Sequence, residues 1–194
     1  MAIENIGSYN ASQIGDISTA EFAALTTAQI TQIKASSVSG LNSDQFSVIT
    51  SSQLQALSAS QIMGLIETQL AYMGVGDSGT APVGINALTT AQIQAIETRD
   101  IDGLTTAQLN GFTTDDLGAL SSRQVGALSS TQVAALTTSK LGQLTSSQVA
   151  SIGSLQFSAM GTDQIAALGT EQIAALNTRQ ISSLTTEQVA SLES

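Results

Sequence analysis

The chain has 194 residues, with 15 acidic against 5 basic side chains, no His, no Cys and one Pro. Without imidazole or thiol groups it lacks the usual general bases, nucleophiles and zinc or haem ligands, so we expect no catalytic, cofactor or metal site and no enzymatic activity. A net charge of −10 disfavours nucleic acid, and no apolar run reaches the roughly 18 to 20 residues of a membrane span. Because 42% of the residues are hydrophobic and 10% are charged, the chain should fold.

Residues 1–73 form an N-terminal array of nine eight-residue repeats, which we call octads. Each octad opens with an apolar residue, the leading residue, and a second apolar residue follows five positions later. The leading residues run from Met1 to Leu65, with Met73 next, and the second series runs from Ile6 to Leu70. Eight steps along a continuous α-helix turn each repeat by about 80° from the last, so one long amphipathic helix is excluded.

Residues 74–87 interrupt the period and hold the single Pro and four of the sixteen Gly. We predict that this is the only substantial irregular segment, a loop or hinge between two arrays. Gly74, Gly76 and Gly79 also match the G-x-G-x-x-G dinucleotide fingerprint. That fingerprint must follow a strand and open a helix, whereas Pro82 and another Gly follow here, so a linker is the preferred interpretation.

Residues 88–194 form a second array of thirteen octads, and Leu192 opens a further, partial one. The leading series from Leu88 and the second series from Ile93 are both unbroken. The first leading residue of this array lies 15 residues after Met73, so the two arrays are out of phase by one residue.

The polar residues of the octad mark a helix start. Ser, Thr, Asn or Gly usually follows the leading residue, and Gln or Glu stands three positions later, which is the spacing of a capping box. The two apolar residues then occupy the positions of a hydrophobic staple. We predict one helix of about six or seven residues per octad, each ended by the next cap. The Gln row comprises Gln13, Glu21, Gln29, Gln45, Gln53, Gln61, Gln69, Gln92, Gln108, Gln124, Gln132, Gln148, Gln156, Gln164, Gln172, Gln180 and Gln188.

One octad buries too little apolar surface to offset the entropy of ordering its backbone, so neighbouring octads must stack. The predicted fold is therefore all-α, a solenoid of very short capped helices with one helix per octad. The alternative is a β-solenoid with three octads per coil and Leu and Ile pointing inward. Ala and Gln are poor strand formers and strict alternation is missing, which favours the helical fold.

The densest acidic stretch contains Glu97, Asp100, Asp102, Asp115 and Asp116. Carboxylates gathered by coiling could hold Ca²⁺, but no D-x-D-x-D-G loop is present, so a solvated surface is the preferred interpretation. Asp100 and Asp116 also stand at the Gln position of their octads, where a polar helix start explains them. Nothing beside this pair resembles a nucleophile or a substrate pocket, so we predict no acid–base pair.

Aromatic and basic side chains also have structural explanations. The four Phe residues stand at staple positions, which predicts core residues and not a platform for base stacking. Four of the five basic residues are scattered over the second array, as solubilising charges are. These sets are Phe22, Phe46, Phe112 and Phe157, and Arg99, Arg123, Lys140 and Arg179.

In the second array, the residue after the cap is Ser or Thr in every octad. Two explanations stay open: similarity among repeats, since a hydroxyl fits the first helical turn, and a hydroxyl row that contacts glycans, ice or another subunit. The row comprises Thr90, Thr98, Thr106, Thr114, Ser122, Ser130, Thr138, Ser146, Ser154, Thr162, Thr170, Thr178 and Thr186.

The repeat wording, Leu-Thr-Thr-Ala-Gln-Ile at 88–93 and Leu-Ser-Ser-Thr-Gln-Val-Ala-Ala-Leu at 128–136, resembles arrays in very long bacterial surface or secreted repeat proteins, often labelled adhesin-like or haem-utilisation proteins. The resemblance covers nearly the whole chain. It implies an extracellular or cell-surface fibre, stalk or adhesin, exported by a leaderless type I route, since no Sec-type signal peptide is visible. The haem label has no support, because His and Cys are absent.

Neither end of the array looks capped, since the first octad opens at Met1 and the last stays in register to Leu192. We therefore expect head-to-tail self-association into an open filament or layer, unless the chain was cut from a longer array. The expected function is that of a non-catalytic structural repeat protein whose main partner is itself. The alternative is an adhesin-like module that binds glycan, ice or a surface protein through the hydroxyl row.

Overall fold

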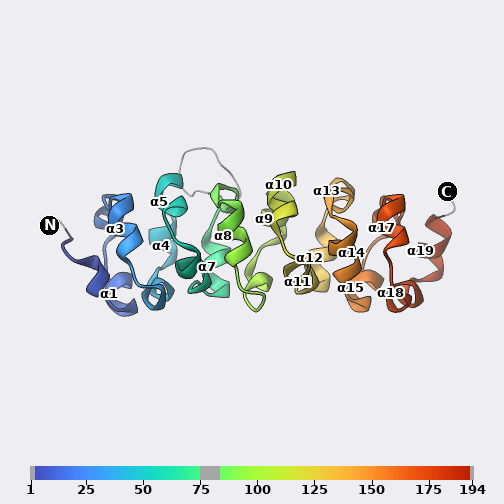
Figure 1. The fold of residues 1–194 in the computed structure, drawn as a ribbon, viewed down its shortest axis with the longest axis horizontal. Coiled ribbons are helices and arrows are strands. Elements are labelled where there is room, and N and C mark those ends of the chain that lie inside the picture. Colours follow the sequence, from blue (N-terminus) through green and yellow to red (C-terminus); the bar gives the residue numbers. More distant parts are fainter. Residues whose placement is uncertain (1–2, 75–83, 193–194) are drawn as a thin grey trace. The chain divides into compact units, whose positions relative to one another are not determined.

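The computed structural model describes residues 3–74 and 84–192, and over these residues it consists of short helices without a strand (Figure 1). The predicted all-α solenoid is confirmed, and the β-solenoid alternative is wrong. The chain divides into two compact units, residues 1–104 and 105–194, and each is described by itself.

Unit 1 contains eight α-helices and four 3-10 helices within its described residues. In chain order they are η1 (Ile6–Ser8), α1 (Ala11–Gly15), α2 (Thr19–Ala23), α3 (Thr27–Gln32), η2 (Ala35–Gly40), α4 (Ser43–Phe46), α5 (Ser51–Gln55), α6 (Ala59–Met63), α7 (Glu67–Tyr72), η3 (Ile85–Ala87), α8 (Thr90–Ala95) and η4 (Ile101–Gly103).

Unit 2, as far as the structure describes it, contains α-helices alone. They are α9 (Thr106–Gly111), α10 (Thr114–Ala119), α11 (Ser122–Gly126), α12 (Ser130–Ala135), α13 (Thr138–Gln143), α14 (Ser146–Ser151), α15 (Ser154–Ser158), α16 (Thr162–Ala166), α17 (Thr170–Ala174), α18 (Thr178–Ser183) and α19 (Thr186–Ser191).

The predicted capping boxes form at most helix starts. Before α3, the Thr26 hydroxyl accepts from the Gln29 amide at 3.2 Å, and Gln29 Oε1 accepts from the Thr26 amide at 2.9 Å. The α-helices have four to six residues, for example Ser43–Phe46 and Thr27–Gln32, so the predicted six or seven was too long. The α-helices are shorter than predicted because the residue that caps the start of each one has an extended backbone, and the leading residue that follows its end often has one too. Ile33, after α3, is an example, with a ψ of 128°.

Two octads that lack both a capping side chain and the Gln form 3-10 helices. Lys34 and Glu97 stand at the cap position, Ser37 and Asp100 stand at the Gln position, and the helices that follow are η2 and η4, without a side-chain cap bond at either start. The octad of Ile66 lacks the cap but keeps Gln69, and it forms the α-helix α7. A 3-10 turn closes with bonds between residues three apart, so it forms even where no side chain satisfies the first amides. Local sequence thus decides which helix type an octad adopts.

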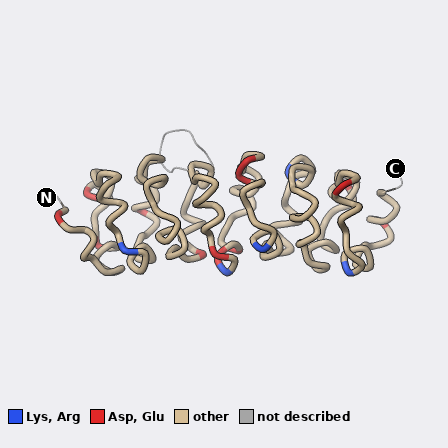
Figure 2. The backbone as a smooth tube through the Cα atoms, in the orientation of Figure 1, with Lys and Arg blue, Asp and Glu red and all other residues tan. Residues whose placement is uncertain are grey.

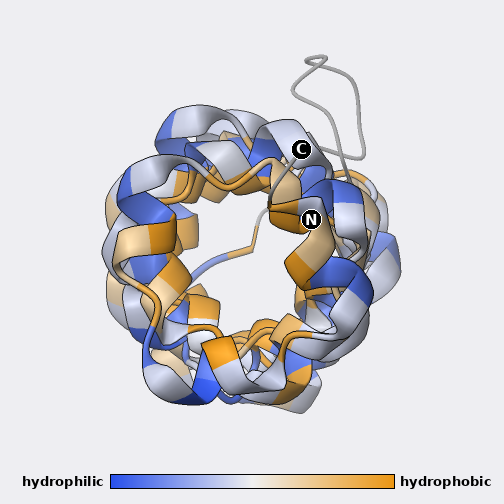
Figure 3. Ribbon diagram, turned by 90° about the vertical axis from the view of Figure 1, so that its right-hand side faces the viewer, coloured by the Kyte–Doolittle hydropathy of each residue, from blue (hydrophilic) through white to orange (hydrophobic). Residues whose placement is uncertain are grey.

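Within each unit, a helix packs against the helix three elements away, with the 3-10 helices counted as elements. In unit 1, α3 packs against η1 and against α5, and in unit 2, α11 packs against α14. The two apolar series point into the coil, and most of their members are at most 7% exposed, including all four Phe. Figure 3 shows hydrophobic segments on the inner side of the coiled chain and hydrophilic segments on the outer side. The Phe residues are core residues, as predicted.

The predicted irregular segment 74–87 is partly helical. Ile85 and Ala87 lie in η3 and are buried, and Ile85 takes the staple position of the octad that Met73 opens. The Ile85 amide donates to the Gly74 carbonyl at 3.0 Å, so the chain leaves this octad and returns to it at adjacent points. Residues 75–83, with most of the G-x-G-x-x-G match, lie outside the described residues. The boundary between the compact units falls at Leu104 and Thr105.

Candidate functional site

The conspicuous polar feature of both units is a buried row of Gln side chains that join successive turns of the coil. Gln61 is 2% exposed, and its Nε2 donates to the carbonyls of Ile30 and Ile33, both at 2.8 Å. Its Oε1 accepts from the Ser58 amide at 2.8 Å and from the Ser58 hydroxyl at 3.0 Å. Each polar atom of this buried amide is therefore satisfied. Gln61 links the start of α6 to the end of α3, one turn earlier.

The same geometry recurs along both units, and we call it the Gln ladder. Each such amide reaches carbonyls 31 and 28 residues earlier, except that Gln92 reaches 38 and 35 residues back, because seven extra residues lie within the turn that contains segment 74–84. The ladder therefore keeps its register across that segment. The members that reach two carbonyls at this spacing are Gln45, Gln61, Gln69 and Gln92 in unit 1, and Gln148, Gln172, Gln180 and Gln188 in unit 2. Gln53 and Gln164 also reach a third carbonyl, and Gln156 reaches carbonyls 30 and 28 residues earlier.

The predicted capping box accounts for the Oε1 contacts of this row. The Nε2 contacts with the preceding turn were not predicted. The missed signal was the near-absence of Glu. A capping box accepts Gln or Glu equally, yet Glu21 is the one Glu in the row, because a carboxylate has no N–H to donate to the preceding turn.

Two other residue types replace Gln while keeping a donor. The Ser37 hydroxyl donates to the Tyr9 carbonyl at 2.8 Å, and Lys140 Nζ donates to the Phe112 carbonyl; both acceptors lie 28 residues earlier, as in the ladder. Lys140 is therefore a member of the ladder and not simply a solubilising charge. One carbonyl is reached in each case instead of two.

Asp100 and Asp116 take the Gln position without a donor. Both are 8% exposed, so the predicted solvated surface is wrong for this pair, whereas Asp102 and Asp115 are exposed. Asp116 completes a capping box, since its Oδ2 accepts from the Thr113 amide at 2.8 Å. The residues described contain no group of three or more carboxylates arranged to hold a metal ion.

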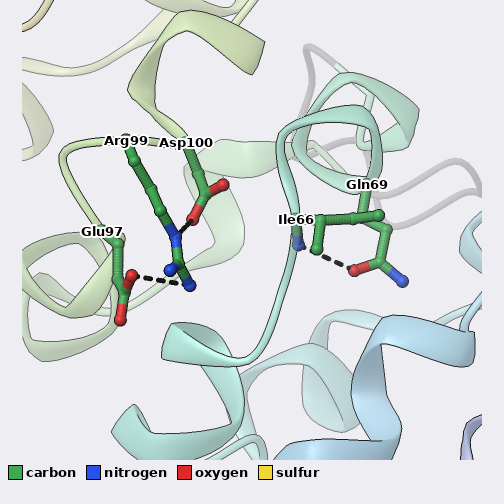
Figure 4. A network of polar contacts seen from close by, with 5 residues as sticks. All are labelled: Ile66, Gln69, Glu97, Arg99 and Asp100. Carbon is green, nitrogen blue, oxygen red and sulfur yellow. Dashed lines mark hydrogen bonds and ion pairs between the residues drawn. The ribbon is translucent and has the colours of Figure 1, made fainter.

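Asp100 belongs to a different polar network (Figure 4). Arg99 lies 2.8 Å from Glu97 and 3.3 Å from Asp100, so this guanidinium bridges two carboxylates of its own octad. Figure 4 also shows Gln69 Oε1, which accepts from the Ile66 amide at 3.0 Å. Ile66 has no polar side chain, so only the Gln half of the capping box exists at α7.

The last described turn of unit 2 exposes apolar residues. Ile181, Val189 and Leu192 are 55%, 46% and 41% exposed, whereas equivalent residues in earlier turns, such as Ile165, are buried. A shallow hollow on this turn is lined by Ala166, Leu168, Thr170, Ile173, Ser191 and Leu192.

The first described turn of unit 1 carries the complementary groups. Gln13 is exposed, and while its Oε1 accepts from the Asn10 amide at 3.0 Å, its Nε2 reaches no carbonyl among the residues described. The Ser18 hydroxyl donates to Glu21 at 2.7 Å and, together with the Ser18 backbone, lowers the pKa of that carboxyl. A hollow on this turn is lined by Ile3, Tyr9, Gln13, Asp16, Ile17 and Glu21.

The remaining predicted features lie on the outer surface. Basic residues are dispersed over both units without forming a patch in the described part of the chain (Figure 2). The hydroxyl row is exposed at Thr90, Thr98, Thr114, Thr138, Thr162, Thr170, Thr178 and Thr186, and half-buried at its other members. Among the described residues, no helix has the length and apolar character needed to cross a bilayer.

Comparison with known families gives one repeat family. The model of the ALTTAQ repeat matches residues 93–130, 112–146, 133–170 and 157–194, which together cover just over half of the chain. Each match overlaps the next, and all four lie within the second array. Comparison with curated proteins gives no match.

Proposed function

The chain belongs to the ALTTAQ repeat family, and we propose that it is a non-catalytic structural protein, a protomer of an extracellular filament or cell-surface stalk that assembles end to end. The carrying observation is the Gln ladder itself, a contact between turns that recurs along both units and that one copy of the chain can offer to another. Exposed apolar residues such as Ile181 and Val189 supply the hydrophobic part of such a contact.

A second copy of the chain is the proposed partner for the exposed apolar residues of the last described turn of unit 2. Inside each unit, the surface that covers such a turn is another octad, which supplies apolar residues and Gln Nε2 donors. The first described turn of unit 1 presents such a donor on Gln13, in the hollow that the half-buried Tyr9 also lines. The two surfaces differ, so the contact is heterologous, and a heterologous contact that does not close on itself produces an open filament.

Ile181→Glu tests this proposal with a matched control. Ile181 is 55% exposed, so a carboxylate at this position should leave the fold intact while opposing burial against a second copy. Leu155→Glu changes a residue that is 78% exposed on α15, away from the last described turn. Sedimentation and electron microscopy over a range of concentrations should show polymers for the native chain and for Leu155→Glu, and monomers for Ile181→Glu.

Two outcomes would overturn end-to-end assembly. One is a native chain that stays monomeric at high concentration without fibres. The other is polymerisation of Ile181→Glu at the native concentration, which would place the contact elsewhere. Circular dichroism of each variant checks that its helices are retained.

The exposed hydroxyl row supports a second candidate, an adhesin-like module that binds glycans or a surface protein. Eight of these side chains are exposed and none of those eight takes part in the ladder. Ice is the weaker ligand, because stacked helices lie about 8 to 10 Å apart and do not repeat hydroxyls at strand spacing. A glycan array tests this candidate with the native chain and with a variant that combines Thr138→Ala, Thr162→Ala and Thr170→Ala. Glycan binding by the variant that equals binding by the native chain would refute it.

The extracellular or cell-surface location is likewise a proposal. It is supported by the resemblance to bacterial surface arrays and is compatible with a chain that has no Cys to oxidise. Protease treatment of intact source cells, followed by immunodetection of the chain, tests it. A chain that is protected until the cells are lysed would contradict the location.

A further inference from the structure

The turns of each unit are joined by side chains and not by backbone hydrogen bonds. Among the described residues within a unit, backbone-to-backbone bonds outside the helices connect residues three or four apart. The one exception is the bond from Ile85 to Gly74, which closes the base of segment 74–84. Hydrogen bonds between turns therefore involve side chains: the Gln ladder and a few others, such as Gln55 Nε2 to the Ala87 carbonyl and Asn110 Nδ2 to the Ala135 carbonyl. Packing of the apolar series supplies the remaining contacts.

We propose that each unit is an elastic element that opens turn by turn under tension and recoils when the tension is released. Every octad packs on the octad three positions away, and its Gln bonds to the end of the helix four elements earlier, so opening one turn leaves the remaining contacts unchanged. Stability in such a stack is a sum over neighbours, and opening can proceed from one turn to the next. A continuous ladder of backbone hydrogen bonds between turns would instead resist tension as one cooperative unit.

The ladder also sets where opening begins. In unit 1, Ser37 replaces Gln and reaches one carbonyl, and Asp100 replaces Gln without a donor and is held by Arg99. The octad of Asp100 lies immediately before the boundary between the compact units. The coil should therefore yield first at the octads that contain these two residues, and last at the octads of Gln45, Gln61 and Gln69.

Single-molecule stretching of the 194-residue chain through handles at its two ends tests this property. One molecule is held at a time, so the result does not depend on end-to-end assembly, although the biological use of elasticity rests on the proposed structural role. A turn of 28 to 31 residues should release roughly 80 to 100 Å of chain. We expect steps of that length or a smooth extension at low force, with recoil on relaxation.

Gln61→Met and Gln94→Met form the matched pair of variants. Gln61 is a ladder member, whereas Gln94 lies exposed on α8 and makes no hydrogen bond in the described structure. At fixed force, the opening rate should rise about tenfold or more for Gln61→Met and stay unchanged for Gln94→Met, because one orphaned carbonyl is a large part of one turn's stability. Rupture of a whole unit in a single step would overturn the proposal. An equal opening rate for the two variants would show that the Gln ladder does not control how fast a turn opens.

Discussion

The side-chain amide of Gln61 lies 2.8 Å from the carbonyl oxygen of Ile33, although 28 residues separate them. Ile33 is the leading residue of an octad one turn earlier, and its carbonyl ends helix α3. A single side chain thus caps the start of its own helix and the end of another, which explains how helices of five or six residues persist. Isolated helices of this length are unstable in water.

Replacing Gln61 with Met should lower the free energy of unfolding by about 2 kcal/mol. Met fills a similar volume, so the expected loss comes mainly from the Ile33 carbonyl, which would be buried without its Gln61 partner, and from the lost bond to the Ser58 amide. Gln94→Met is the control and should change stability by less than about 0.5 kcal/mol. Urea unfolding followed by circular dichroism measures both, and equal effects would contradict the role of the ladder.

Replacing Leu136 with Asp should cost about 3 kcal/mol or more, because Leu136 is 4% exposed and an unpaired charge would enter the core. Thr138 lies two residues away on the exposed surface, and Thr138→Ala should alter stability by less than about 0.5 kcal/mol. Thermal unfolding of the two variants checks this difference. Similar melting temperatures would mean that the apolar series is wrongly placed.

Gly64 and Gly118 should respond to Ala in opposite directions. A Cβ at Gly64 would lie 2.2 Å from the Ala35 carbonyl oxygen, so the turns must separate, at a cost of about 1 to 3 kcal/mol. A Cβ at Gly118 would have no heavy atom within 4 Å, and Ala there should stabilise helix α10 by about 0.5 to 1 kcal/mol. Denaturant midpoints report the sign of each change. Stabilisation by Gly64→Ala would refute the close approach.

Ser18→Ala should raise the pKa of Glu21. The Ser18 hydroxyl donates to this carboxylate and lowers its pKa, so Glu21 stabilises the fold above its unfolded-state pKa and loses that contribution as the pH falls through its folded-state pKa. NMR titration of the Glu21 carboxyl carbon measures the shift. Glu187 is the control: hydrogen bonds to its own backbone and to Thr185 lower the pKa of its carboxyl, and this pKa should not change in the Ser18→Ala variant. An unchanged Glu21 titration would show that the Ser18 bond does not form in solution.

The sequence by itself determined the all-α solenoid, the register of the octads and the start of each α-helix. These follow from contacts within eight residues, since a cap, its Gln and the staple pair of Ser58, Gln61, Leu57 and Ile62 all lie in one octad. For the same reason, the missing caps at Lys34 and Glu97 were visible in the sequence, although their consequence, the 3-10 helices, was not predicted.

Only the tertiary structure decided which carbonyls the Gln amides reach. Gln61 pairs with Ile30 and Ile33 because of how many octads complete a turn, a quantity set by packing of the apolar residues and absent from any single octad. Burial at the ladder position also depends on neighbouring turns, so Gln13 and Gln61 have the same local sequence setting, yet one is exposed and the other is 2% exposed. Local hydrogen bonding specifies each helix, and the contacts between turns specify the coil.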